Sequence, residues 1–282
     1  MQLKLCFLAI TMSLSGWMSA QSFFGSQYND RYFTINIGTG QTAYFGELNH
    51  RFSLEEGLSN YNLGFEARLL NHISARTTFE FYRISGDDSD AADSSFAQQR
   101  NLSFRSKNFA ANLQAIYYLF PYNDIYHKRR PIEPFVALGF GFTSINPQAK
   151  IDSSFVDLRG LKTEGVDYRG SSFMIPIGLG AKFKLNQVVN LILEANYNLT
   201  FTDYLDDVSN TYGRSFETEL AATLSNRKNE VGVIDQEIYD SLAPGGKRGN
   251  PNTNDGYFSI AIKLEFYLPG NLFSKRQNAA EN

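Results

Sequence analysis

The side chains that most often carry out chemistry are sparse in this sequence. Its 282 residues include three histidines, His50, His72 and His127, and one cysteine, Cys6. The histidines fall in separate segments of the chain, and no metal-binding pair is visible. An esterase or acyltransferase would need a histidine, a nucleophile and a carboxylate at one end of the fold, and only His50 could serve there. A solvated loop histidine is the simpler interpretation, so we expect no enzyme, no catalytic residue, no metal and no cofactor.

A short acidic stretch suggests a second kind of chemistry. Asp87, Asp88, Asp90 and Asp93 place carboxylates close together in the chain. Carboxylate oxygens are ligands that calcium prefers, but the stretch lacks the ligand spacing of a calcium loop and its closing glutamate. A solvated loop is the simpler interpretation, and the sequence leaves calcium binding open.

Composition and the N-terminal segment indicate an exported protein. Apolar residues make up 43% of the chain, aromatic residues 15%, and the net charge is −3. Acids and bases are interspersed, which excludes the basic patch that nucleic-acid binding needs. Residues 1–20 contain Lys4, an apolar core and Ala20 at the end, a pattern that predicts a cleaved secretory signal peptide. Cys6 lies in this segment, so the mature chain has no thiol. No later apolar run is long enough for a transmembrane helix.

Beyond residue 30, apolar and polar side chains alternate along long segments, which is the period of a strand with two different faces. In 189–202, for example, Leu191 and Leu193 share one face while Asn190 and Glu194 share the other. The same pattern predicts strands near 32–47, 61–70, 73–84, 104–120, 133–144, 173–185 and 257–268. Helical spacing is almost absent, so the sequence predicts an all-β fold of eight strands.

The lengths of the connections predict how these strands are arranged. Long connections near 48–60, 85–103, 145–172 and 203–256 alternate with shorter ones near 70–72, 121–132 and 186–188. Outer-membrane barrels have long external loops and short periplasmic turns, whereas a soluble sandwich has no reason for this alternation. The prediction is an eight-stranded antiparallel up-and-down transmembrane β-barrel over residues 21–270, with long external loops and a polar tail at 271–282.

The positions of the charges assign the two faces of the strands. The apolar faces carry none, and a cation there would cost about 2–4 kcal/mol near the bilayer midplane. We predict that the charges on the opposite faces form a paired network in the lumen: Glu66, Arg68, Arg76, Glu80, Lys182, Lys184, Glu194, Lys263 and Glu265. Side chains fill so small a barrel, so no diffusion pore is expected. The alternative, a soluble lipocalin-like barrel or sandwich, would have its apolar face inside and shorter strands. We therefore expect the exterior to contact outer-membrane lipid.

A basic run lies in one of the predicted periplasmic turns. His127, Lys128, Arg129 and Arg130 could contact anionic headgroups or an acidic partner protein. Basic residues at a membrane edge can also occur without any partner, so both interpretations stay open.

Several segments resemble a known family. They are YFGELN (44–49), EPFVALGFGFTSINPQAK (133–150), DLRGLKTEG (157–165), IPIGLGAKFKL (175–185) and FTDYLDDVSNTY (201–212). These segments resemble the PorG-like family of small outer-membrane barrels of Bacteroidota, which is associated with type IX secretion. The resemblance implies a barrel that contacts the periplasmic ring lipoprotein of that secretion machine and its partner subunit, and it carries over no catalytic residues.

Eight residues of the family motifs are candidates for structural or partner contacts: Thr163, Glu164, Gly165, Thr202, Asp203, Tyr204, Asp206 and Asp207. Short polar side chains after a strand can cap and turn the backbone as it leaves the barrel, and an acidic turn can pack over the barrel mouth. We expect a non-enzymatic accessory or anchoring component of type IX secretion. The alternative is a stand-alone structural or surface-binding barrel that uses its long external loops.

Overall fold

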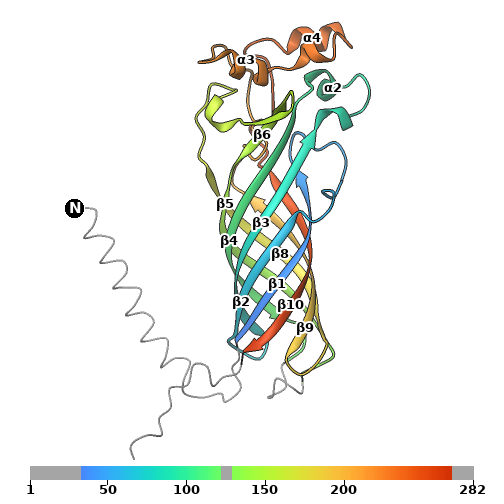
Figure 1. Ribbon diagram of the computed structural model, residues 1–282, viewed down its shortest axis with the longest axis vertical. Coiled ribbons are helices and arrows are strands. Elements are labelled where there is room, and N and C mark those ends of the chain that lie inside the picture. The colour runs from blue at the N-terminus through green and yellow to red at the C-terminus, as the bar shows by residue number, and fades with distance from the viewer. Residues whose placement is uncertain (1–32, 122–128, 269–282) are drawn as a thin grey trace, which may run out of the picture.

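The computed structural model describes residues 33–121 and 129–268. Within them, eight long strands wind around one axis and form a barrel (Figure 1). The strands are β1 (Phe33–Phe45), β2 (Asn60–Arg68), β3 (Ile73–Asp87), β4 (Ser103–Tyr118), β5 (Ile132–Ser144), β8 (Ser171–Lys184), β9 (Val189–Thr200) and β10 (Gly256–Leu268). The predicted signal peptide (1–20), the predicted tail (271–282), His127 and Lys128 lie outside the described residues.

The barrel is closed by its first and last strands. Each strand pairs antiparallel with the next barrel strand, and β10 returns to pair with β1. In this closing pair Phe33 lies opposite Leu268, and Phe45 lies opposite Gly256. A closed barrel has no unpaired edge, which lipid requires because it offers no hydrogen bonds to the backbone. The predicted eight-stranded antiparallel barrel is confirmed, and each strand lies within a few residues of its predicted range.

Additional short elements lie in the loops at one end of the barrel. A hairpin of β6 (Pro147–Ile151) and β7 (Ser154–Asp157) extends the wall beside β4. The helices are η1 (Asp88–Asp90), α2 (Phe96–Arg100), η3 (Arg159–Leu161), α3 (Glu219–Ser225), η4 (Lys228–Glu230) and α4 (Gln236–Ser241). They are too short to produce a helical period in the sequence. Along the described chain, no helix combines the length and apolar character needed to cross a membrane.

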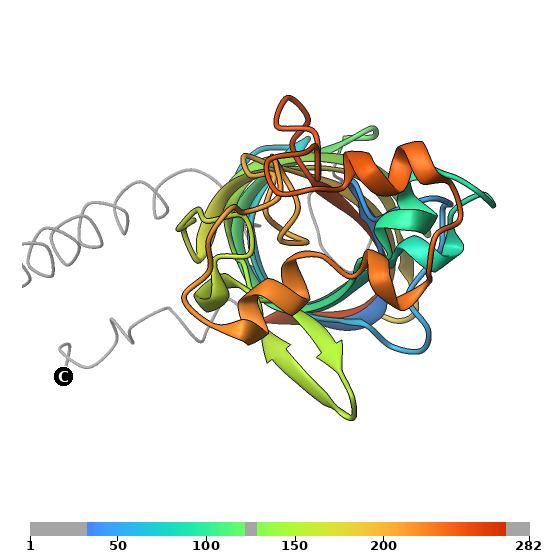
Figure 2. The same cartoon turned by 90° about the horizontal axis from the view of Figure 1, so that it is seen from above.

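The long and short connections lie at opposite ends of the barrel. The labelled helices and β6 gather at the end shown uppermost, and the tight turns 69–72 and 185–188 lie at the other (Figure 1). These turns are closed by backbone hydrogen bonds from Leu69 N to Ile73 O at 2.9 Å and from Leu185 N to Val189 O at 3.1 Å. Seen along the barrel axis, the long loops surround and partly cover the mouth (Figure 2).

The outer face of the barrel is apolar and the inner face is polar. Every barrel strand exposes large apolar side chains, among them Ile37, Leu138, Leu179 and Ile262, which are 56%, 58%, 65% and 56% exposed. The charged residues of the opposite face, such as Arg76 at 0% exposure, are buried inside. The soluble alternative, with an apolar interior, is therefore wrong, and the outer surface is suited to contact with lipid.

Placing a cation on this outer face tests the assignment. Ile262 lies in the middle of β10 and points outward. We expect Ile262→Lys to lower the free energy of unfolding of the barrel in lipid vesicles by about 2–4 kcal/mol, because the cation must enter the hydrocarbon region. Asn252→Lys, in an exposed external loop, is the matched control and should change little. Equal stability of the two variants in urea titrations would contradict a lipid-facing β10.

Candidate functional site

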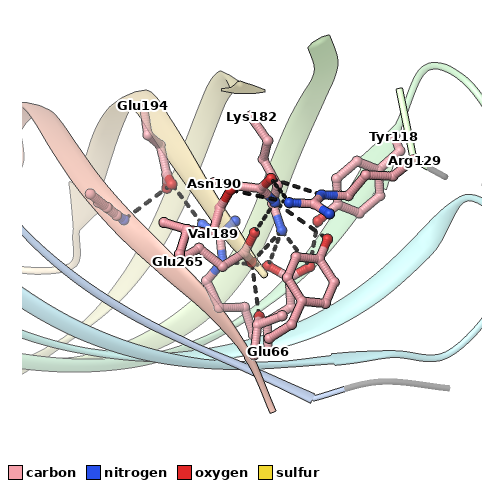
Figure 3. A network of polar contacts seen from close by, with 12 residues as sticks. Glu66, Tyr118, Arg129, Lys182, Val189, Asn190, Glu194 and Glu265 are labelled. Carbon is pink, nitrogen blue, oxygen red and sulfur yellow. Dashed lines mark hydrogen bonds and ion pairs between the residues drawn. The ribbon is translucent and has the colours of Figure 1, made fainter. Parts of the chain in front are cut away.

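Inside the barrel, six of the nine predicted charges form one network of ion pairs (Figure 3). Glu66 on β2 accepts from Arg76 Nε at 3.1 Å and from Lys182 Nζ at 3.0 Å. Lys182 on β8 also contacts Glu265 Oε1 on β10 at 2.6 Å. Each charge therefore has an opposite charge beside it, which offsets the cost of burying it.

Arg76 connects Glu66 to two further charged residues across the lumen. Its Nη1 contacts Glu194 Oε2 on β9 at 2.6 Å, and Lys263 Nζ on β10 contacts the same oxygen at 3.1 Å. The six residues come from β2, β3, β8, β9 and β10. The network therefore links β2 and β3 across the lumen to β8, β9 and β10.

The other three predicted charges are Glu80, Arg68 and Lys184, and their surroundings differ. Glu80 accepts a hydrogen bond from the Asn60 side chain and has no ion-pair partner in the described part of the chain. Arg68 places its guanidinium carbon 3.9 Å from the ring centre of Tyr118. Lys184 is half-buried at the end of β8. Strand alternation placed all three on the inner face, but it does not indicate which inward charges pair.

The lumen around the network has little free space. A cavity of about 10 Å³ lies between Glu80, Asn62 and Asn112, which is room for about one water molecule. The ion pairs and polar side chains thus fill the stretch of lumen that they occupy.

Of the basic run, the structure describes Arg129 and Arg130. Arg129 is only 3% exposed and donates to the backbone oxygens of Asn186 and Gln187, both at 2.8 Å. Its guanidinium carbon lies 4.5 Å from the ring centre of Tyr267. The side chain of Arg129 therefore holds the turn at 185–188, which accords with the interpretation that needs no partner. Arg130 is exposed and remains a candidate for a partner contact.

The loops at 46–59, 88–102, 145–170 and 201–255 lie at the other end of the barrel, and we call them the external cap. Within the cap, residues of the family segments 157–165 and 201–212 contact one another. Glu164 accepts hydrogen bonds from Ser209 N at 2.9 Å and Asn210 N at 3.0 Å. The hydroxyl of Tyr204 donates to the same carboxylate at 3.3 Å. Gly165 turns the chain with φ of 74°, in the left-handed region that favours glycine.

Asp207 joins the same motifs from the other side. It accepts from the Thr163 hydroxyl and, at 2.6 Å, from the Tyr168 hydroxyl. Arg248 bridges the two acids, with Nη1 at 3.0 Å from Glu164 and Nη2 at 3.4 Å from Asp207. No pattern in the sequence singles out Arg248, because it lies in a polar loop without strand periodicity. Within the cap, these motif residues therefore contact one another and Arg248.

Two of the three remaining motif residues, Thr202 and Asp206, also make local contacts, whereas the carboxylate oxygens of Asp203 have no hydrogen-bond partner in the described residues. Thr202 accepts from Asp255 N through its backbone oxygen at 2.9 Å and from Tyr204 N through its hydroxyl at 3.2 Å. Asp206 accepts from Val208 N at 2.8 Å. Both side chains therefore accept from the backbone N–H two residues further along the chain, a contact that turns the backbone as it leaves β9.

The acidic stretch does not converge on one point. Asp88 is buried and contacts Arg100 Nη2 and His50 Nε2, both at 2.8 Å. The other three acids each contact a different group. These separate contacts do not support calcium binding there. In the described residues no hydroxyl group hydrogen-bonds to His50, so the geometry expected of an esterase is not assembled around it.

Burial changes the acidity of several carboxyl groups of the cap. It raises the pKa of Asp203 to about 7, with smaller contributions from Glu47 and Glu164 nearby. The pKa values of Asp206 and Asp255 are also raised, first by burial and then by repulsion from neighbouring carboxylates. These groups lose their protons less readily than acids in water.

A pH dependence of cap stability follows from Asp203. Its pKa is near 3.9 in an unfolded loop, so the folded cap binds more protons between that value and about 7. We expect the free energy of cap opening to fall as the pH rises through this window. Hydrogen exchange of the cap amides, corrected for the intrinsic rate, measures it. Asp203→Asn should raise protection at pH values above about 7, whereas Asp240→Asn, at an exposed acid, should not. Protection that increases with pH would contradict this assignment.

A closed barrel of eight antiparallel strands, with an apolar exterior, a charged interior and long loops at one end, has the architecture of the outer-membrane β-barrels. Residues 33–227 match the family described as "Domain of unknown function (DUF6089)", and the chain belongs to this family. None of the curated proteins matches the sequence.

Several solved structures are similar in fold. Neisserial surface protein A shares 10% identity at a TM-score of 0.40, over 84% of this chain and 97% of that chain. Ail of Yersinia pestis shares 9% at 0.40, over 85% and 99%. The N-terminal barrel of Pseudomonas aeruginosa OprF shares 10% at 0.37, over 83% and 97%. At such low values we draw no functional conclusion from them.

Proposed function

We propose that this protein is a non-enzymatic barrel of the outer membrane that anchors, or is an accessory part of, a protein secretion machine of the PorG-like, type IX kind. The observation that carries the proposal is the filled lumen. Five ion pairs occupy it, so contact with other molecules is left to the outer surfaces. The apolar exterior supports residence in the lipid bilayer.

The short-turn end is the proposed place of contact. By the resemblance to the PorG-like family, a periplasmic ring lipoprotein and its partner subunit would bind there. Arg130, Leu119 and Phe120 are exposed on the connection between β4 and β5, and the guanidinium carbon of Arg130 lies 5.0 Å from the ring centre of Phe120. A cation beside apolar side chains suits an acidic surface with an apolar margin.

Site-specific photo-crosslinking in intact cells tests this proposal. A photoreactive residue would replace Arg130 in one variant and Val233, exposed in the external cap, in the other. Capture of the ring lipoprotein from position 130 and not from position 233 is the expected result. If position 130 captures only abundant outer-membrane proteins or lipid, the secretion role fails while the barrel fold stands.

A cleft in the external cap favours a second candidate function. It has a volume of about 480 Å³ and is lined by charged side chains of both signs, among them Arg105, Lys150, Glu56 and Asp87. Such a cleft suits a polar ligand bound from outside, as expected of a stand-alone surface-binding barrel. A third variant with the photoreactive residue at Lys150, which is exposed and lines the cleft, tests this function: capture of a surface ligand there, and not from position 130, would favour it.

A further inference from the structure

Three carboxylates from neighbouring strand ends converge at the mouth of the barrel. Glu47 follows β1, Asp206 follows β9, and Asp255 directly precedes β10. β10 pairs with β1 on one side and with β9 on the other, so all three strand ends are adjacent. One oxygen of each carboxylate lies within 4.8 Å of the other two. The barrel wall itself therefore brings these acids together.

The described residues supply no cation that pairs with these three acids. Asp206 is 1% exposed and Asp255 is 2% exposed. The buried cations of the cap, Arg100 and Arg248, form their ion pairs with other carboxylates. Across 33–121 and 129–268, none of the three acids takes part in an ion pair. Burial of like charges at this separation is unfavourable without a compensating charge.

Two oxygens of the group are left without hydrogen bonds. Asp206 Oδ2 and Glu47 Oε2 are buried and have no partner in the described residues. The other oxygens are held in place: Asp206 Oδ1 accepts from Val208 N at 2.8 Å, and Asp255 Oδ1 accepts from the Tyr44 hydroxyl at 2.7 Å. Donors that orient carboxylates while leaving an oxygen free are typical of the surroundings of a metal ion.

One further observation indicates that the site is built into the fold. A Cβ at Gly46 would lie 2.0 Å from Asp255 Oδ1 and 1.8 Å from the Tyr44 hydroxyl oxygen. Only glycine therefore leaves room for the Asp255 carboxylate in its present position.

We propose that Glu47, Asp206 and Asp255 bind one divalent cation of the Ca²⁺ class. The donors are all oxygen, without histidine or thiolate, which suits a hard cation that completes its coordination with water. Binding ties the loop after β1 to both ends of the connection between β9 and β10, and so closes the cap over the mouth. The proposal does not depend on the role in secretion.

Metal binding to the full chain in detergent micelles tests the proposal. After chelation, calorimetric titration should detect one Ca²⁺ per chain, with a dissociation constant of roughly 10⁻⁴–10⁻³ M, as in extracellular sites. Asp206→Asn should weaken binding at least about tenfold. Asp240→Asn, an exposed acid of the same loop, is the matched control and should leave binding unchanged. Equal weakening by both variants, or an equal affinity for Mg²⁺, would overturn the assignment.

A second measurement needs only the unmodified protein. Terbium, an oxygen-seeking substitute for Ca²⁺, should luminesce when tyrosine is excited, because the Tyr44 hydroxyl contacts Asp255. Excess Ca²⁺ should abolish that emission. Ca²⁺ should also slow hydrogen exchange of the Leu205 and Val208 amides, which donate to the acids of the site. A Ca²⁺ concentration of about 10 mM exceeds the dissociation constants of the weakest extracellular sites. If that concentration changes neither the terbium emission nor the hydrogen exchange, the acids are neutralised by protons and the proposal fails.

Discussion

Replacing Arg76 by alanine is expected to lower the free energy of unfolding of the barrel by about 3–5 kcal/mol. Arg76 is fully buried and contacts both Glu66 and Glu194. Its removal leaves Glu66 with Lys182 alone and Glu194 with Lys263 alone, in a lumen where water has little access. Urea unfolding in lipid vesicles, followed by loss of the β-sheet circular dichroism signal, measures the change.

The matched control for Arg76 is on the same strand. Arg83 also pairs with a glutamate, Glu55 at 3.1 Å, but its side chain is 36% exposed. Arg83→Ala should cost no more than about 1 kcal/mol, because solvent screens the pair. The double change Arg76→Met with Glu66→Gln should recover part of the loss, since it removes one charge of each sign and leaves Lys182 paired with Glu265 and Lys263 paired with Glu194. Equal destabilisation by Arg76→Ala and Arg83→Ala would show that the lumen network contributes no special stability.

Replacing Arg248 by alanine is expected to open the external cap without unfolding the barrel. Arg248 is 2% exposed and contacts Glu164 and Asp207. Its loss leaves two buried carboxylates without their cation, at a cost of about 3–5 kcal/mol. The amides of Ser209 and Asn210 donate to Glu164 and report on the cap directly. Their hydrogen exchange should accelerate at least about 100-fold, while the barrel amides keep their protection.

Another arginine of the same loop provides the control for Arg248. Arg227 contacts Glu230 at 2.8 Å, and that glutamate is 46% exposed. Arg227→Ala should change exchange at Ser209 and Asn210 by less than about tenfold, because a partly exposed pair contributes at most about 1 kcal/mol. If Arg248→Ala also changes hydrogen exchange at Ser209 and Asn210 by less than about tenfold, the contacts of Glu164 and Asp207 do not depend on the buried cation.

The barrel strands could be predicted because their signal is local. In 189–200, alternate residues face lipid and lumen, and that period is visible without knowledge of any partner strand. The same period placed Glu66, Arg76 and Lys182 on the inner face, where the structure has them. The hairpin β6–β7 and the short helices of the cap were missed because they are too short to establish a period.

Contacts between distant loops could not be predicted in this way, because they depend on the tertiary structure. Strand order and register determine that Glu47, Asp206 and Asp255 share one end of three adjacent strands, and no local pattern in the sequence records that placement. Arg248 likewise became recognisable as the partner of Glu164 and Asp207 only when the chain between β9 and β10 folded back over the mouth. Arg129 was expected at a surface and is buried against a turn instead. The side of the strand on which a residue lies, and the charge it carries, are properties of a single strand and can be deduced from the residues alone. Pairing of charges depends on closure of the barrel, because closure brings together side chains that are far apart in the chain.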